Sequence, residues 1–80
     1  MPSHGYANSL ESVMYSVILA DNRDWIVCRN SEGLARRSCY SAAIALAAHL
    51  AWRECSRSRV RTAVFEQDDQ GGWRQIRAFE

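Results

Sequence analysis

The 80-residue sequence contains no lysine, and all ten of its basic residues are arginine. It has no internal repeat and no low-complexity segment, and its length allows only one domain. Its three cysteines, Cys28, Cys39 and Cys55, form no Cys-x-x-Cys pair of the kind that binds zinc, and their odd number argues against a disulfide framework. We therefore expect a reduced, cytoplasmic protein that uses cysteine as a small core residue and holds no metal and no cofactor.

The sequence also lacks an apolar segment long enough to cross a bilayer. The longest, residues 42–52, is interrupted by His49 and is shorter than the roughly 20 residues that a membrane helix needs. The first six residues, Met-Pro-Ser-His-Gly-Tyr, lack the basic segment and apolar run of a signal peptide. We expect no membrane partner, and we interpret residues 1–10 as a flexible lead-in to a single α+β domain over residues 11–80.

No catalytic signature is present either. His49 lies one helical turn before Arg53, whose charge disfavours a protonated histidine. Cys39 precedes the predicted helix, a position that can lower a thiol pKa, but no histidine is placed in the sequence to complete a catalytic pair. The glycines at 71 and 72 precede a strand and not a helix, so they do not form a phosphate-binding loop. We predict that the protein is not an enzyme.

Hydrophobic periodicity predicts several strands and one helix. An alanine-rich segment without glycine or proline predicts a helix over residues 42–56, with Ser41 as its N-terminal cap. Alternating residues and intervening turn signals predict strands over residues 13–20, 25–29, 60–67 and 73–79, with a short additional strand over residues 34–38. The order β-β-(β)-α-β-β predicts an α+β fold: an antiparallel sheet of four or five strands with one helix packed on one face.

The charges are unevenly distributed along the chain. Residues 36–61 hold six arginines against one acid, Glu54, and so carry a formal charge of +5, whereas residues 1–35 and 62–80 each carry −2. The planar guanidinium group of arginine can donate two parallel hydrogen bonds to one carboxylate or phosphate, so such a cluster can mark a binding face. Alternatively, Arg53 and Arg57 complement the dipole at the helix end, and the others are ordinary solvated surface residues.

The predicted helix and sheet also have more apolar surface than one contact between them can cover. Leu46 and Trp52 fall outside the helix stripe that should pack on the sheet. Alternation sends Met14, Ile18 and Phe65 to one face of the sheet, where nothing else in the chain is available to cover them. A homodimer is the simplest way to bury this surplus. The helix stripe itself comprises Ile44, Ala47, Ala48, Ala51 and Cys55, flanked by Ala43 and Leu50.

These observations together favour a non-enzymatic module that binds another protein. We expect the contact to lie on the outer helix face and in the basic segment that follows it. The alternative is a nucleic-acid-binding protein that uses the basic region 36–61 along the phosphate backbone, with Tyr15, Trp25, Phe65 and Trp73 as stacking residues on the sheet. A sequence pI of about 7.8 is low for that alternative. The predicted partner-binding residues are Leu46, His49, Trp52, Arg53, Arg57, Arg59 and Arg61.

Between Tyr15 and Phe79 the sequence resembles a family of small uncharacterised bacterial domains. The shared pattern consists of Tyr-x-Val and Trp-x-Val strands, a glycine turn, an alanine-rich helix, a further strand and a turn of acidic residues and glycine. Residues 42–51 depart from it because they lack the lysine and glutamate usual there. The resemblance implies the fold only, since the family has no established activity. The matching residues are Tyr15-Ser16-Val17, Trp25-Ile26-Val27, Gly33, residues 42–51, Val64 and residues 69–72.

In its small size, its lack of a catalytic motif and its localised charge, the sequence is also similar to small phage-encoded inhibitors, including anti-CRISPR proteins. Those proteins are single compact domains without a catalytic site, and they act through charged surfaces. The similarity implies an inhibitor function for this chain, again as an expectation.

Overall fold

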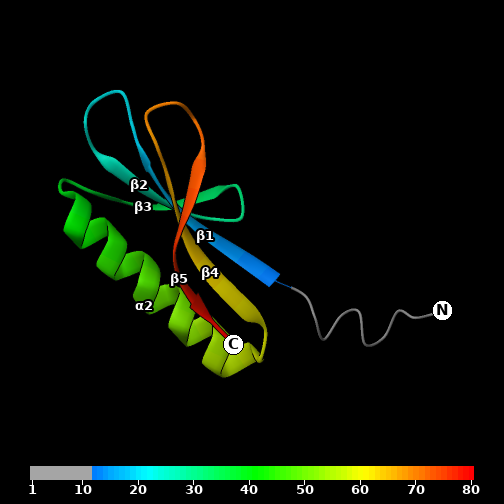
Figure 1. Cartoon of the computed structure of the whole chain (residues 1–80). Coiled ribbons are helices and arrows are strands. Elements are labelled where there is room, and N and C mark those ends of the chain that lie inside the picture. Colours follow the sequence, from blue (N-terminus) through cyan, green and yellow to red (C-terminus); the bar gives the residue numbers. More distant parts are fainter. Residues whose placement is uncertain (1–11) are drawn as a thin grey trace.

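The computed structural model describes residues 12–80. Their five strands form one sheet in the order β3-β2-β1-β4-β5, and the helix packs across one of its faces (Figure 1). The predicted α+β architecture is confirmed, including the short third strand. The expected lead-in, residues 1–10, lies outside the described residues. In chain order the elements are β1 (Ser12–Leu19), β2 (Trp25–Arg29), β3 (Glu32–Arg37), α2 (Tyr40–Ser58), β4 (Arg61–Gln67) and β5 (Trp73–Phe79).

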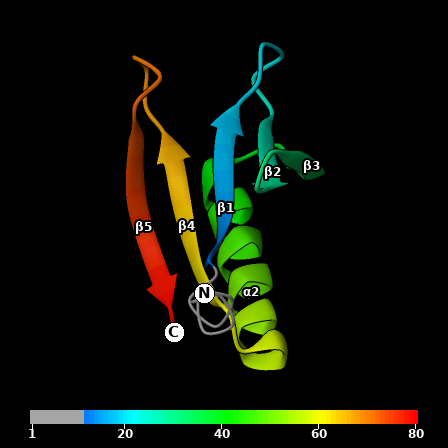
Figure 2. The ribbon, with the colours of Figure 1, turned by 90° about the vertical axis from the view of Figure 1, so that its right-hand side faces the viewer.

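The sheet is mostly antiparallel, but its central pair, β1 and β4, is parallel. Because these two strands run in the same direction, the turns that follow them lie at the same end of the sheet (Figures 1 and 2). The helix runs in the opposite direction, so α2 begins near those turns and finishes at the other end (Figure 2). This topology determines where the charged residues gather.

The helix begins earlier than predicted and has a different cap. Cys39, with φ −136° and ψ 152°, is the extended N-terminal cap residue, and its carbonyl accepts a bond from the Ala43 amide at 3.2 Å. The expectation that Ser41 caps the helix is therefore wrong, because Ser41 already lies in the first turn. At the other end, Arg59 adopts the left-handed conformation, and its amide donates to the Cys55 carbonyl at 3.0 Å. This bond satisfies one of the last free carbonyls of α2.

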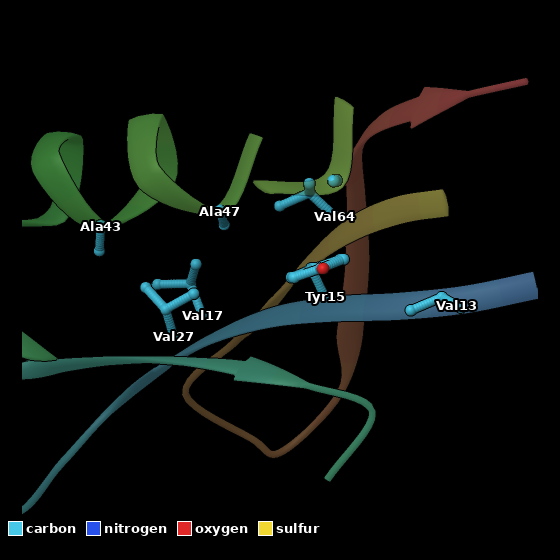
Figure 3. Packing of buried hydrophobic residues seen from close by; sticks show 8 residues of the cluster. Val13, Tyr15, Val17, Val27, Ala43, Ala47 and Val64 are labelled. Atoms are coloured by element: carbon cyan, nitrogen blue, oxygen red, sulfur yellow. The ribbon is translucent and has the colours of Figure 1, made fainter. Parts of the chain in front are cut away.

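The core lies between α2 and one face of the sheet (Figure 3). Ala43, Ala47 and Ala51 are fully buried, and their small side chains allow the helix to approach the strands closely. The buried hydroxyl of Thr62 donates to the Ala51 carbonyl at 2.8 Å, which links β4 to the helix. Ile44, a member of the predicted stripe, and Leu50, which flanks it, are half-buried against this core. The strands contribute Val13, Tyr15, Val17, Val27 and Val64.

The opposite face of the sheet has no element over it among residues 12–80. Figures 1 and 2 show α2 along one face only. Since Val13, Tyr15 and Val17 point to the helix, strand alternation places Met14 and Ile18 on the opposite face. Phe65 lies on that face too, because it is paired with Ser16 in the neighbouring strand. The predicted separation of the two sheet faces is therefore confirmed.

Candidate interaction surface

The C-terminal half of α2 and the residues after it gather the positive charge of the molecule. Arg53 and Arg57 are exposed on the helix, Arg59 ends it, and Arg61 opens β4. Within residues 12–80, none of these four arginines lies within ion-pair distance of an acidic side chain. Their guanidinium groups are therefore free to meet an external anion.

Glu54, the one acid in this part of the chain, does not neutralise them. Its carboxylate accepts from Arg29 through Nε at 2.9 Å and Nη2 at 2.5 Å. The Tyr15 hydroxyl donates to the same carboxylate at 2.6 Å. Because Arg29 comes from β2, outside the basic region, Glu54 is already compensated and the charge of the four nearby arginines remains.

This three-residue network is structural and not an acid–base pair. Burial, followed by the hydrogen bond to Glu54, raises the pKa of Tyr15 to about 12. Hydrogen bonding from Arg29 holds the pKa of the Glu54 carboxyl below its ordinary value. At neutral pH the phenol is therefore protonated and the carboxylate ionised. Sequence reasoning missed this network, although Glu54 is the only acid on the helix and so signalled a specific partner.

An aromatic side chain lies beside the free arginines. Trp52 is 52% exposed, a high fraction for a side chain of this size. It lines a shallow hollow together with His49, Arg53, Ser56 and Arg57, and the rings of His49 and Trp52 have centroids 6.2 Å apart. An indole ring and several guanidinium groups therefore share one continuous area. A second hollow, which shares Ser56 with the first, is lined by Arg59 and Arg61 together with Glu80. We call the two hollows together the arginine surface and define it as His49, Trp52, Arg53, Ser56, Arg57, Arg59 and Arg61.

Leu46, which we expected beside these residues, lies differently. It is half-buried and packs against the core, so it supports the helix more than it extends the surface.

The basic region is also divided in space. Arg36 lies on β3, where it contacts Asp24 at 3.4 Å, and Arg37 donates to the Arg36 carbonyl. The first half of α2, about 14 Å from Tyr40 to His49, lies between these two arginines and the arginine surface.

The opposite end of the molecule is acidic. The turn after β1 carries Asp21 and Asp24, and the turn after β4 carries Asp68 and Asp69. Asp68 accepts from two backbone amides of its own turn, so part of this charge shapes the loop. Nearby, Glu66 accepts from Tyr40 at 2.7 Å and from Arg74 at 2.8 Å. Most acids of the two flanks thus gather at one end, whereas Glu80 lies at the other end beside Arg59 and Arg61, without an ion pair to either.

The aromatic residues proposed to stack nucleic-acid bases do not form one platform. Tyr15 is buried beneath the helix, and Trp25 packs edge-on against Tyr40, with ring centroids 5.1 Å apart. Phe65 and Trp73 lie on the opposite sheet face. Within the arginine surface, only Arg61 shares a strand and a face with Phe65, whereas Arg53 and Arg57 lie on the helix, across the sheet from it.

The remaining chemical candidate is Cys39. Its thiol is exposed at the start of α2, and its Sγ lies 3.6 Å from the Ser41 hydroxyl. Hydrogen bonds with that hydroxyl and with the Ala42 amide lower its pKa, so the helix start acts on the thiol as expected. In the described part of the chain, no three His, Cys, Asp or Glu side chains gather as a metal site would require.

Comparison of the chain with protein-family models, with curated proteins and with solved structures finds no match. Over residues 12–80, no helix combines the length and apolar character needed to cross a membrane.

Proposed function

We propose that this domain is a protein-binding module, of the inhibitor type, that holds an acidic patch of its partner on the arginine surface. The observation that carries the proposal is the set of four exposed arginines without acidic partners beside the half-exposed Trp52.

The chemistry of the arginine surface fits a protein partner. Free guanidinium groups can bind carboxylates through two parallel hydrogen bonds, and here they break no internal ion pair to do so. Tryptophan and arginine are the residues that most often dominate interface energy, particularly when a tryptophan enters a pocket. We therefore expect Trp52 and Arg53 to be the main anchors, with Arg57, Arg59 and Arg61 adding charge at the rim.

The distribution of charge favours a compact acidic patch over a nucleic acid. A phosphate backbone is a long line of negative charge. A strand that continued along α2 beyond the arginine surface would approach the acidic turns that carry Asp21, Asp68 and Asp69. A localised patch on a protein avoids that repulsion.

The test is affinity capture from a bacterial lysate, with and without nuclease, using three forms of the tagged protein. The first is the natural chain, and the second carries Arg53→Glu and Arg57→Glu. The third carries Arg23→Glu and Arg37→Glu, which makes the same change in charge at exposed residues without acidic partners away from the arginine surface. We expect a discrete protein that survives nuclease, is lost with the second form and is retained by the third.

Binding to the purified partner then supplies the affinity. We expect Trp52→Ala to weaken it at least about tenfold, as for a typical interface anchor. Capture that disappears with nuclease, together with a steep salt dependence spread over several arginines, would instead identify a nucleic-acid-binding protein. Equal capture by all three forms would reject the arginine surface as the binding site.

A further inference from the structure

A hollow of about 790 Å³ lies at the acidic end of the molecule, between the end of β1 and the turn after β4. It lies beyond the start of α2, because both hairpins extend past that end of the helix (Figure 2). Tyr40, the first residue of α2, reaches its border, where the Tyr40 hydroxyl donates to Glu66. We call it the hairpin hollow and define it by Leu19, Trp25, Glu66, Asp68, Asp69 and Arg74.

The topology of the sheet explains why a hollow forms there. β1 and β4 are parallel neighbours, and the order β3-β2-β1-β4-β5 takes the chain from β1 toward one edge and from β4 toward the other. Connections that leave adjacent parallel strands in opposite directions open a crevice at the carboxyl ends of those strands, and open α/β sheets bind their ligands in such a crevice. Here the two connections are hairpin turns, and the crevice between them is the hairpin hollow.

One wall of the hairpin hollow is apolar. Leu19 and Trp25 are paired across β1 and β2, and alternation from the buried Val17 places both on the face that carries the core. The helix does not reach Leu19, so this side chain is 52% exposed on a face that is otherwise covered. Trp25 is half-buried beside it. This wall therefore offers apolar surface that the body of a ligand can cover.

The other wall carries carboxylate oxygens that form no hydrogen bond. Glu66 accepts from Tyr40 and Arg74 through Oε1 only. Asp68 accepts from the backbone of its own turn through Oδ1 only. Oε2 of Glu66, Oδ2 of Asp68 and both oxygens of Asp69 accept no hydrogen bond from residues 12–80. Three oxygen-rich side chains of the hollow can thus accept from a donor outside the chain.

The charge of the hairpin hollow is negative. Its three carboxylates and one guanidinium group give a formal charge of −2. Hydrogen bonds from Arg74 and Tyr40 lower the pKa of Glu66, and the nearby charge of Asp68 opposes that shift. Glu66 and Asp68 therefore repel each other, and a cation placed between the acids relieves this repulsion.

The positions of the acids favour an organic cation over a metal ion. Among the described residues 12–80, no three His, Cys, Asp or Glu side chains converge as the ligands of one metal ion do. A guanidinium or ammonium group instead presents several separated donors, and its apolar stem can lie along an apolar wall. Arg74 provides an internal example, since its Nη2 contacts Glu66 at 2.8 Å while the side chain remains 70% exposed.

We propose that the hairpin hollow binds an organic cation, namely a guanidinium or ammonium group on an apolar stem. The cationic group contacts Asp68 and Asp69. The stem lies along Leu19 and Trp25. The volume of the hollow is in the range of small-molecule sites. A free small molecule and the side chain of a basic peptide present this same chemistry, and the site is separate from the arginine surface at the other end.

NMR titration of the isotope-labelled 80-residue protein with three probes tests the proposal. Butylguanidinium has both the charge and the stem, butylurea has the same shape without the charge, and the guanidinium ion has the charge without the stem. We expect butylguanidinium to give saturable shifts of the amides of residues 66–71 and of the Trp25 indole, with a dissociation constant of about 1 mM. The guanidinium ion should bind about tenfold more weakly, and butylurea should give no saturable shift.

Two pairs of variants at exposed positions separate the two walls. Asp69→Asn should raise the dissociation constant of butylguanidinium about threefold, whereas Asp21→Asn, in the turn after β1 and outside the lining, should leave it nearly unchanged. Leu19→Ala should weaken butylguanidinium but not the guanidinium ion. Its control is Leu34→Ala, at a position of β3 that is similarly exposed and lies outside the hollow. The same spectra show that each variant is folded.

A blocked Gly-Arg-Gly tripeptide distinguishes the two sources of the cation. An affinity at least about tenfold above that of butylguanidinium supports a peptide side chain, and an equal or lower affinity supports a free small molecule. The proposal is overturned if butylguanidinium gives no saturable shift at residues 66–71 up to about 10 mM. Equal affinities for butylurea and butylguanidinium would also overturn it, as would equal effects of Asp69→Asn and Asp21→Asn.

Discussion

The guanidinium group of Arg29 contacts both carboxylate oxygens of Glu54 across the interface between β2 and α2. The Tyr15 hydroxyl adds a third bond from β1 to the same carboxylate. Two strands and the helix are thereby joined at one polar point beside an otherwise apolar core. The last turns of α2, which carry the arginine surface, are held against the sheet by this contact.

We expect Glu54→Gln to lower the free energy of unfolding by about 1–2 kcal/mol, because it removes a charge-assisted contact from a side chain that is only 16% exposed. The partial exposure of Arg29 places the loss at the lower end of the range for such bonds. Guanidinium unfolding followed by circular dichroism measures the change. Glu32→Gln, at an exposed acid of β3 without an ion pair, is the control, and an equal loss in both variants would contradict the prediction.

The same network predicts a stability plateau bounded on both sides by pH. The pKa of Glu54 is lowered in the fold by Arg29, so its contribution is present above the ordinary carboxyl pKa of 4.5 and is lost as pH falls through the lower folded value. The pKa of Tyr15 is raised from 10.0 to about 12, so its contribution is present below pH 10 and is lost as pH rises toward 12. Melting temperatures across pH measure both limits.

Tyr15→Phe separates the two limits. Without the phenol, the alkaline decline above pH 10 should become shallower, while the acid limit set by Glu54 should remain. An alkaline limb with the same slope in both proteins would show that another group is responsible.

The alanine contact between helix and sheet should not tolerate larger residues. We expect Ala47→Leu to destabilise the domain by about 2 kcal/mol, because Ala47 is fully buried and three added carbons must displace the strands or the helix. Ala45→Leu, at an exposed position of the same helix, should change stability by less than about 0.5 kcal/mol. Thermal unfolding of the two variants provides the comparison. Similar losses of stability in both variants would contradict the close approach of the helix to the sheet.

Arg59 occupies a conformation that glycine adopts more easily. Its φ of 57° and ψ of 39° lie in the left-handed region, so Arg59→Gly should raise the free energy of unfolding by up to about 1 kcal/mol. Arg59→Ala keeps the unfavourable conformation and should give no gain. Chemical unfolding distinguishes the two. If Arg59 contributes to partner binding, both variants should lose the same affinity despite their different stabilities.

Periodicity was enough to predict the layers of the fold. The alternation of Val13, Tyr15 and Val17 with Met14 and Ile18 separated the two sheet faces, and the alanine-rich segment identified the helix that covers one of them. These patterns follow directly from the two-residue repeat of a strand and the 3.6-residue repeat of a helix. The structure confirms both assignments.

Strand neighbours and local polar contacts could not be predicted in the same way. Alternation assigns a residue to a face but does not say which strand lies beside it, so the parallel pairing of β1 with β4 was not expected. A helix cap depends on backbone angles, which favoured Cys39 although Ser41 has the better capping side chain. The contact between Arg29 and Glu54 joins residues 25 positions apart, and no local pattern marks it.

The parallel seam between β1 and β4 also has a consequence for the folding pathway. The pair joins Ser12 to Arg61, so it can close only after the intervening chain, with the whole of α2, has returned to the start of β1. The hairpins β1–β2 and β4–β5 involve neighbouring segments and close over short loops. Local contacts form quickly, whereas distant ones carry the entropy of a long loop. The barrier to folding should therefore lie at the docking of two preformed hairpins, with the helix as the bridge that brings them together.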